Sequence, residues 1–127
     1  MAEILEILWP GKSGTSYRYW IYSIGLSFKE EPSNYIFAKE SSPGHWRPSY
    51  IGQTENLAQR PGDQEQESCA RRNGATHIHA HLTSGGEEAR KAEEQDLIQK
   101  WKPPCNEPQK AAKQLNETDG TEVRPAP

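Results

Sequence analysis

The residues best suited to chemistry are a phenol and a guanidinium on either side of a glycine. Tyr50 and Ile51 have strand-type side chains, and Gly52 lets the backbone turn. Thr54 suits the N-cap of a short helix that would carry Arg60. Such a strand-to-helix junction leaves the backbone open to a ligand, so Tyr50 and Arg60 could bind a phosphate there. Both side chains could equally serve packing and solvation.

Composition indicates one small domain with polar extensions. The chain has 127 residues, of which 32% are hydrophobic, and a mean hydropathy of -1.00, so we expect part of it to be disordered. The net charge of -3 is opposite in sign to that of most nucleic-acid-binding proteins, so any grip on nucleic acid must be local. No apolar run approaches a membrane span and no signal-peptide pattern is visible, which predicts a soluble protein with no membrane contact.

The cysteine content is low. Two cysteines, Cys69 and Cys105, do not make a disulfide framework, which fits a reducing cytosol or nucleus. We therefore expect a cytoplasmic location, with Cys105 as a small buried residue.

Side-chain patterning predicts alternating strands and helices between an extension over residues 1–16 and a disordered tail over residues 108–127. Aromatic and β-branched residues predict strands over 18–24 and 34–39, the second pairing through a long loop with the strand at Tyr50. Helices are predicted from 64 to 73 and from 88 to 101, the latter with Ser84 and Glu87 as a capping box. Residues 75–82 alternate, so Ile78, Ala80 and Leu82 should face a core.

Several motifs occur in a fixed order: Tyr35-Ile36-Phe37, Tyr50-Ile51-Gly52-Gln53-Thr54, Arg60, Glu94-Gln95-Asp96-Leu97-Ile98 and Pro104-Cys105-Asn106. This order, over residues 33–107, resembles the GIY-YIG nuclease superfamily, and most of all its small standalone members. The resemblance implies an α+β domain over residues 17–107, with a small three-stranded antiparallel β-sheet flanked by helices. It also implies that Tyr35 and Tyr50 are the motif tyrosines, Arg60 the motif arginine, Glu94 the metal ligand and Asn106 a supporting residue near the site.

These residue types suit metal-dependent, endonuclease-type hydrolysis of phosphodiester bonds. Glu94 can hold a hard divalent ion such as Mg²⁺ or Mn²⁺. Arg60 can make two parallel hydrogen bonds to phosphate oxygens. An ordinary phenol titrates near pH 10, so its ionisation at pH 7 costs about 4 kcal/mol unless a nearby cation helps. We expect Tyr50 to act as general base or proton relay, with Tyr35 as its hydrogen-bonded partner or as the residue that positions water.

Two positions depart from the family pattern. Ser33-Asn34 stands where the first motif usually has glycine and an apolar residue. Gln64 stands where many relatives have histidine or tyrosine, and a glutamine can hold a water but cannot take its proton. Asp63 or one of the histidines at 77, 79 and 81 could cover that role. Otherwise the domain is a weak or inactive GIY-YIG-like module that binds nucleic acid or another protein.

Further candidates surround this set. Lys39, Arg47, Arg71 and Arg72 could track a nucleic-acid backbone, which we expect to be DNA, or form an ordinary charged surface. The row His77, His79, His81 could bind zinc, with Cys69 or Cys105, or be a wet polar face. Because the overall charge is acidic, a protein partner could recruit the domain to its substrate.

Overall fold

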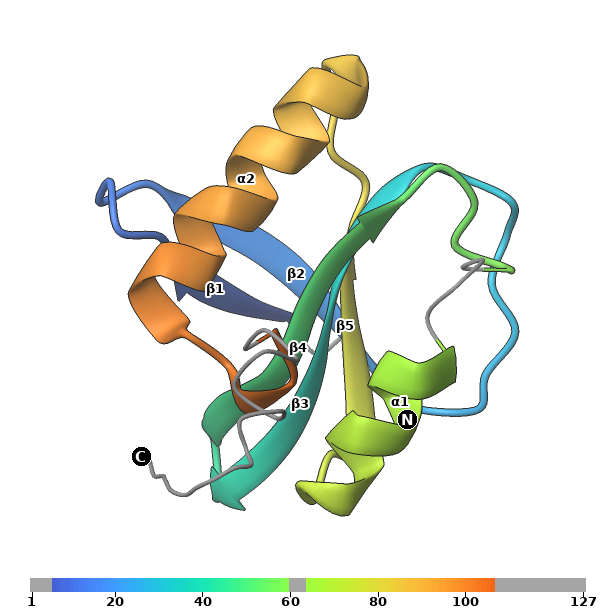
Figure 1. Cartoon of the computed structure of the whole chain (residues 1–127), viewed down its shortest axis with the longest axis vertical. Coiled ribbons are helices and arrows are strands. Elements are labelled where there is room, and N and C mark those ends of the chain that lie inside the picture. Colours follow the sequence, from blue (N-terminus) through green and yellow to red (C-terminus); the bar gives the residue numbers. More distant parts are fainter. Residues whose placement is uncertain (1–5, 60–63, 107–127) are drawn as a thin grey trace, which may run out of the picture.

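The computed structural model describes residues 6–59 and 64–106, which form an α+β fold around one five-stranded antiparallel sheet (Figure 1). The predictions of α+β class and antiparallel pairing are confirmed, whereas the sheet has five strands instead of three. Its strand order is β1-β2-β5-β3-β4. The strands are β1 (Glu6–Pro10), β2 (Ser16–Ser23), β3 (Ser33–Ser42), β4 (His45–Thr54) and β5 (His77–His81), and the helices are α1 (Gln64–Arg72), α2 (Gly86–Trp101) and the 3-10 helix η1 (Pro104–Asn106).

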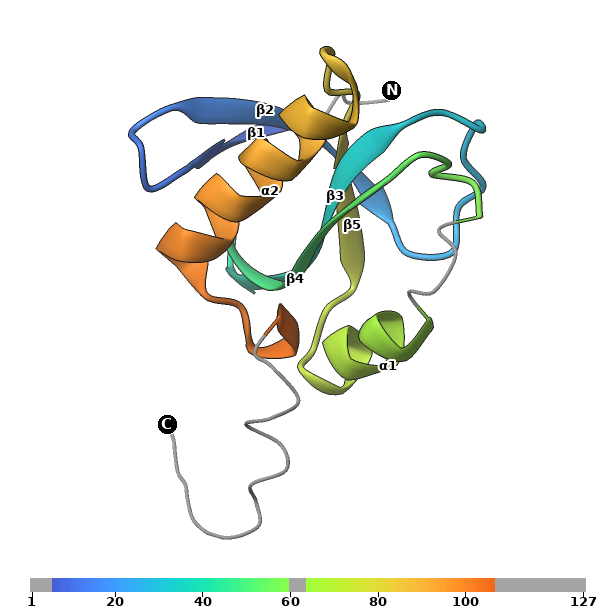
Figure 2. The same cartoon turned by 45° about the horizontal axis from the view of Figure 1, so that its top comes forward.

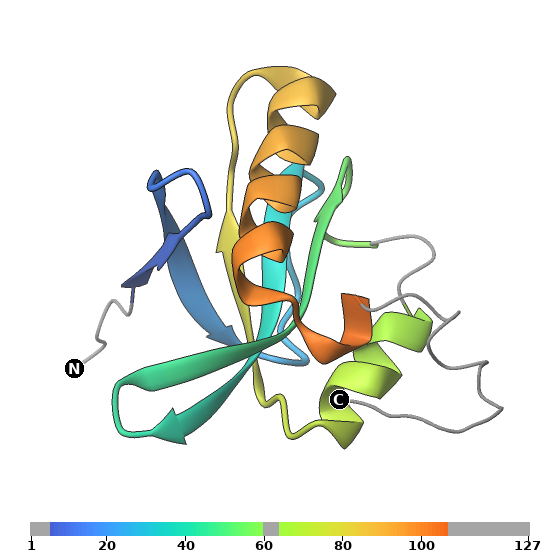
Figure 3. The same ribbon diagram turned by 60° about the vertical axis from the view of Figure 1, so that its left-hand side comes forward.

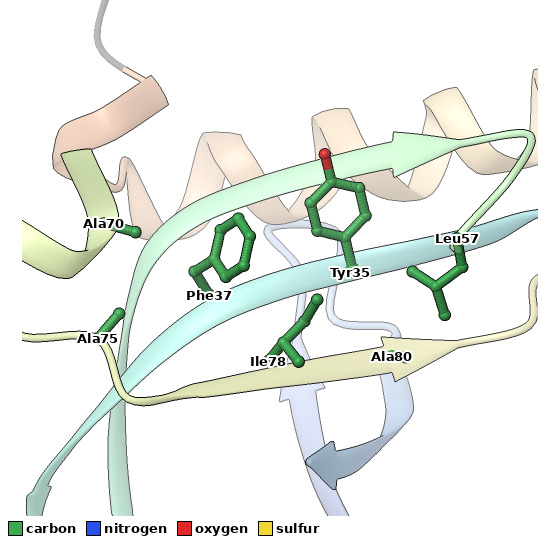
Figure 4. Close-up of a cluster of buried hydrophobic side chains, with 7 residues drawn as sticks. All are labelled: Tyr35, Phe37, Leu57, Ala70, Ala75, Ile78 and Ala80. Atoms are coloured by element: carbon green, nitrogen blue, oxygen red, sulfur yellow. The ribbon is translucent and has the colours of Figure 1, made fainter. Parts of the chain in front are cut away.

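The strand β3 is covered on both faces, because its side chains alternate between two cores. Tyr35 and Phe37 belong to the core beneath α1, whose seven buried residues are drawn in Figure 4. Ile36 and Ala38 belong to the core beneath α2, together with Trp9, Tyr19, Ile51 and Leu97. Figure 2 shows α2 crossing the sheet, with α1 well separated from α2. The continuous apolar run at 35–38 is the pattern expected of a strand buried on both sides.

Part of the extension predicted over residues 1–16 forms β1, which pairs with β2 and lies at an edge of the sheet. Asp96 of α2 fastens this hairpin to the domain. Its carboxylate accepts hydrogen bonds from the Ser13 backbone at 2.8 Å, the Ser13 hydroxyl at 2.7 Å and the Tyr17 hydroxyl at 2.7 Å. These hydrogen bonds lower the pKa of the Asp96 carboxyl.

The wet polar face suggested for the histidines of β5 is wrong for His79, whereas His77 and His81 are partly exposed. His79 is 0% exposed, because β5 lies inside the sheet and its histidine face is covered by Trp9, Trp46 and the α2 core. Leu82, which was expected in a core, lies beyond the end of β5 and is 56% exposed. The alternation was correct, but a sheet covered on both faces buries the polar side as well.

Two local predictions about helices also fail. No helix forms over residues 55–59, where β4 continues to Thr54 and a turn follows, with the Asn56 backbone donating to the Thr54 hydroxyl at 3.1 Å. The capping box at Ser84 does not form either, because α2 begins after Gly85, which adopts a left-handed conformation with φ 102°. The helix α1 and the end of α2 at Trp101 were predicted correctly.

The two cysteines form a disulfide, although their number was taken to fit a reducing compartment. Cys69 on α1 is bonded to Cys105 on η1, across 36 residues of sequence. Sequence spacing could not predict this, because the two residues meet only after α2 has crossed the sheet and returned the chain to α1. The expectation of a reducing compartment therefore loses its basis in the cysteine count.

None of the described helices has both the length and the apolar character needed to cross a membrane.

Candidate functional site

Tyr35 and Tyr50 lie side by side on the α1 face of the sheet, from the adjacent strands β3 and β4. Their ring centroids are 6.1 Å apart, and Tyr35 is only 3% exposed whereas Tyr50 is partly exposed. Figure 4 shows the Tyr35 hydroxyl pointing towards β4. The structure thus brings together two residues that the motif order predicted to act together.

Gly52 makes this pairing possible by leaving space between the rings. A Cβ at Gly52 would lie 2.8 Å from Tyr35 Cζ, 2.9 Å from the Tyr35 hydroxyl and 2.8 Å from Tyr50 Cε2. The sequence prediction gave Gly52 a turn, but β4 continues through it to Thr54. A glycine inside a strand often marks such a close approach, and that signal was available in the sequence.

A β-bulge and a side-chain clamp set the position of Tyr50 on β4. Phe37 pairs with Tyr50 and Ala38 with Pro48, so Ser49 is the extra residue of the bulge. At Ile51, the residue after Tyr50, the Asn106 side chain accepts a hydrogen bond from the backbone N–H at 2.7 Å and donates one to the backbone carbonyl at 2.8 Å. Asn106 therefore acts as an added strand partner beside Tyr50, on the outer edge of β4.

Three carboxylates of α2 differ in their partners. Glu93 accepts from the Tyr19 hydroxyl at 2.6 Å and contacts His81 Nδ1 at 2.9 Å, and Asp96 holds the β1–β2 hairpin. Glu94 makes no hydrogen bond or ion pair with any described residue, although it is half-buried. Burial raises its pKa to about 7, against a smaller opposing effect of Lys91. A desolvated carboxylate without a partner is typical of a functional group.

Glu94 lies on the flank of α2 that faces β4. It follows Arg90 by one helical turn on the same side of the helix, and Arg90 Nε donates to the Gln53 side chain of β4 at 3.0 Å. The tyrosine pair and Glu94 thus approach β4 from opposite faces, and β4 is the edge strand at which the two faces meet.

Three predicted site residues are not defined by the geometry. Arg60 and Asp63 lie outside the described residues. Gln64 is the first residue of α1, but its side chain is not among those described.

The departure at Ser33-Asn34 needs no glycine. Both residues are fully buried at the start of β3, and neither has a positive φ. Asn34 donates to the Arg90 carbonyl at 2.9 Å and accepts from the Thr83 hydroxyl at 2.6 Å, so its amide joins β3 to α2. Ser33 and Asn34 therefore have a structural role at the position where the motif usually has glycine and an apolar residue.

The four basic candidates fall into two groups. Lys39 and Arg47 are directly paired across β3 and β4. Arg71 and Arg72 end α1, where Arg71 Nε binds Glu67 at 3.1 Å. Within residues 6–59 and 64–106, no three histidine, cysteine or acidic residues group to hold a metal ion, and Cys69 and Cys105 are bonded to each other. The zinc reading of the histidine row therefore has no support there.

Comparison with known proteins identifies no relative: no family model, curated protein or solved structure matches this chain.

Proposed function

We propose that this protein is a small metal-dependent nuclease of the GIY-YIG type that hydrolyses phosphodiester bonds in nucleic acid, with DNA as the expected substrate. The observation that carries the proposal is the Tyr35 and Tyr50 pair, packed over the bare backbone of Gly52 at the edge strand. Arg60 enters from the motif order alone.

The described site residues have roles that their surroundings support. The partly exposed Tyr50 acts as general base or proton relay and takes the proton that the attacking water loses. The more buried Tyr35 orients Tyr50. Asn106 keeps the Ile51 backbone, and with it Tyr50, in a fixed place. Arg60 neutralises the phosphate through paired hydrogen bonds.

Glu94 fits the divalent ion that the family implies. Its half-buried carboxylate lacks a partner among the described residues, so an oxygen-seeking cation such as Mg²⁺ or Mn²⁺ would offset its desolvation. Such an ion supplies charge neutralisation at the phosphate and lowers the pKa of a bound water. A single carboxylate suffices, because Mg²⁺ keeps several of its waters.

A second candidate function is binding without cleavage. Gln64, at the start of α1, cannot accept the proton that histidine or tyrosine would take at that position. In that case the domain would bind nucleic acid or a protein partner through the same surface.

The test is cleavage of plasmid, flapped and single-stranded DNA and of RNA, at low salt with Mg²⁺, Mn²⁺ or chelator. We expect Tyr50→Phe and Glu94→Gln to lose roughly 10²- to 10⁴-fold in rate. Tyr22→Phe and Glu88→Gln are matched controls on exposed positions of β2 and α2 and should cleave normally. Cleavage that is unchanged in Tyr50→Phe, or that survives chelator, would refute the proposal.

A further inference from the structure

A pocket of about 580 Å³ opens between the β3–β4 hairpin and the segment that joins α2 to η1. Figures 1 and 3 show this segment returning from α2 beside the hairpin. Cations and indoles line it together: Lys39, Arg47 and Lys102 with Trp46 and Trp101. None of the described residues that line it is acidic, although the whole chain has a net charge of -3.

The cations keep their positions at a cost to stability. Lys39 and Arg47 are directly opposite each other on adjacent strands, where like charges repel. Lys102 has φ 47°, the only positive φ of a non-glycine residue in the described part of the chain, at a helix end that normally takes glycine. None of the three forms an ion pair with a described acidic side chain. An anion in the pocket would offset the repulsion between Lys39 and Arg47.

The indoles are held in place before any ligand arrives. The Trp46 ring packs edge-to-face with the rings of His77 and His79, with ring centroids 4.9 Å and 4.8 Å apart. Trp101 donates its Nε1–H to the Pro10 carbonyl at 2.9 Å. Both rings are partly exposed. Fixed aromatic rings beside cations are the usual surface for stacking unpaired bases.

The pocket wall is also fixed to the candidate site. Pro104 lines the pocket, and its neighbour Cys105 is bonded to Cys69 of α1. Asn106, the next residue, clamps Ile51 beside Tyr50. Ser49, the bulge residue before Tyr50, lines the pocket as well. The pocket and the tyrosine pair are therefore neighbours along β4.

We propose that this pocket binds an unpaired nucleotide of a nucleic-acid strand, with its base against Trp46 and Trp101 and its phosphates on Lys39, Arg47 and Lys102. This volume accommodates one nucleotide. The inference rests on the proposed function only in taking nucleic acid as the ligand. It adds that the substrate carries a single-stranded segment next to the bond that is cut.

Binding is measured without metal, in chelator, by fluorescence anisotropy of a labelled thymidine oligonucleotide of about ten residues, and by tryptophan fluorescence. We expect Arg47→Glu to weaken binding more than roughly tenfold and to lower its salt dependence. Lys102→Gly should weaken it roughly threefold or more while the protein becomes no less stable, since glycine accepts the left-handed backbone. Lys12→Ala, in the exposed β1–β2 turn, removes one positive charge, as Lys102→Gly does, and should bind like wild type.

The role of the bases is tested by replacing them. A matched abasic strand and a blunt duplex should each bind at least about fivefold more weakly than the oligonucleotide, without its quenching of tryptophan fluorescence. Equal binding of polyphosphate would reduce the pocket to an anion site, and equal competition by a free mononucleotide would assign it to that ligand instead. Either result overturns the inference, as does normal binding by Arg47→Glu.

The two proposals fail separately. Loss of cleavage in Tyr50→Phe with unchanged binding by the pocket variants would uphold the nuclease and overturn the pocket. Binding that depends on the pocket residues, by a protein that cleaves no substrate, would uphold the pocket and overturn the nuclease.

Discussion

Trp9 donates its Nε1–H to Nδ1 of the fully buried His79, at 3.0 Å. This hydrogen bond requires His79 to be an acceptor at Nδ1, so the neutral ring carries its proton on Nε2, for which the described residues offer no partner. Burial, with a smaller contribution from His77, lowers the pKa of His79 to about 3.

We predict that stability falls with acidity because of His79. The pKa of His79 is 6.5 in the unfolded chain and about 3 in the folded protein. Between pH 6.5 and pH 3, the unfolded state is therefore protonated at this histidine and the folded state is not. The full stability is present above pH 6.5 and decreases by up to a few kcal/mol, on the order of 3–5, as the pH falls towards 3. Urea unfolding from pH 4 to pH 8 measures it. His79→Gln should flatten this slope, and His45→Gln, at the exposed start of β4, should keep it. Equal slopes in all three proteins would contradict the assignment.

Gly52→Ala should displace the tyrosine pair. The added Cβ meets both rings at 2.8 Å, so one ring must move, at a cost of about 1–3 kcal/mol. We expect a lower urea midpoint, altered near-ultraviolet circular dichroism and loss of any cleavage. Gln53→Ala, on the opposite face of the same strand, should leave the tyrosine signal unchanged. A Gly52→Ala protein with normal stability would show that the rings are not packed against this residue.

Removal of the disulfide should destabilise the fold by about 4 kcal/mol, because the bond closes a loop of 36 residues in the unfolded chain. The double variant Cys69→Ser, Cys105→Ser should show this decrease in urea unfolding. Reductant should lower the wild-type midpoint by a similar amount and leave the double variant unaffected. A wild-type midpoint that ignores reductant would mean that the bond does not form.

Sequence reasoning predicted local patterns well and their surroundings poorly. The alternation in residues 75–82 and the helix ending at Trp101 were visible in side-chain periodicity. That His79 is buried could not be seen, because it depends on β5 lying between β2 and β3 in the sheet. The contacts of Asn106 with Ile51 and of Cys105 with Cys69 join residues more than thirty positions apart, which only the completed fold brings together.

The candidate site divides in the same way. The motif order named Tyr35 and Tyr50 as a pair, and they are neighbours across β3 and β4. Lys39 and Arg47 were named as basic candidates, but Trp46 and Trp101 were not connected with them. Nothing local indicates that the end of α2 returns to this hairpin.

Glu94→Gln should stabilise the metal-free protein while it removes cleavage. Burial raises the folded pKa of Glu94 from 4.5 to about 7, so the unfolded chain loses this proton first and the stability decreases between these pH values. The variant should therefore exceed wild type above pH 7, by on the order of 1 kcal/mol after allowance for partial exposure, and match it near pH 4. Thermal unfolding at both pH values measures this, and Mg²⁺ should raise the Tm of wild type but not of the variant. Glu88→Gln, exposed on the same helix, should change neither quantity. A Mg²⁺ shift that persists in Glu94→Gln would place the metal elsewhere.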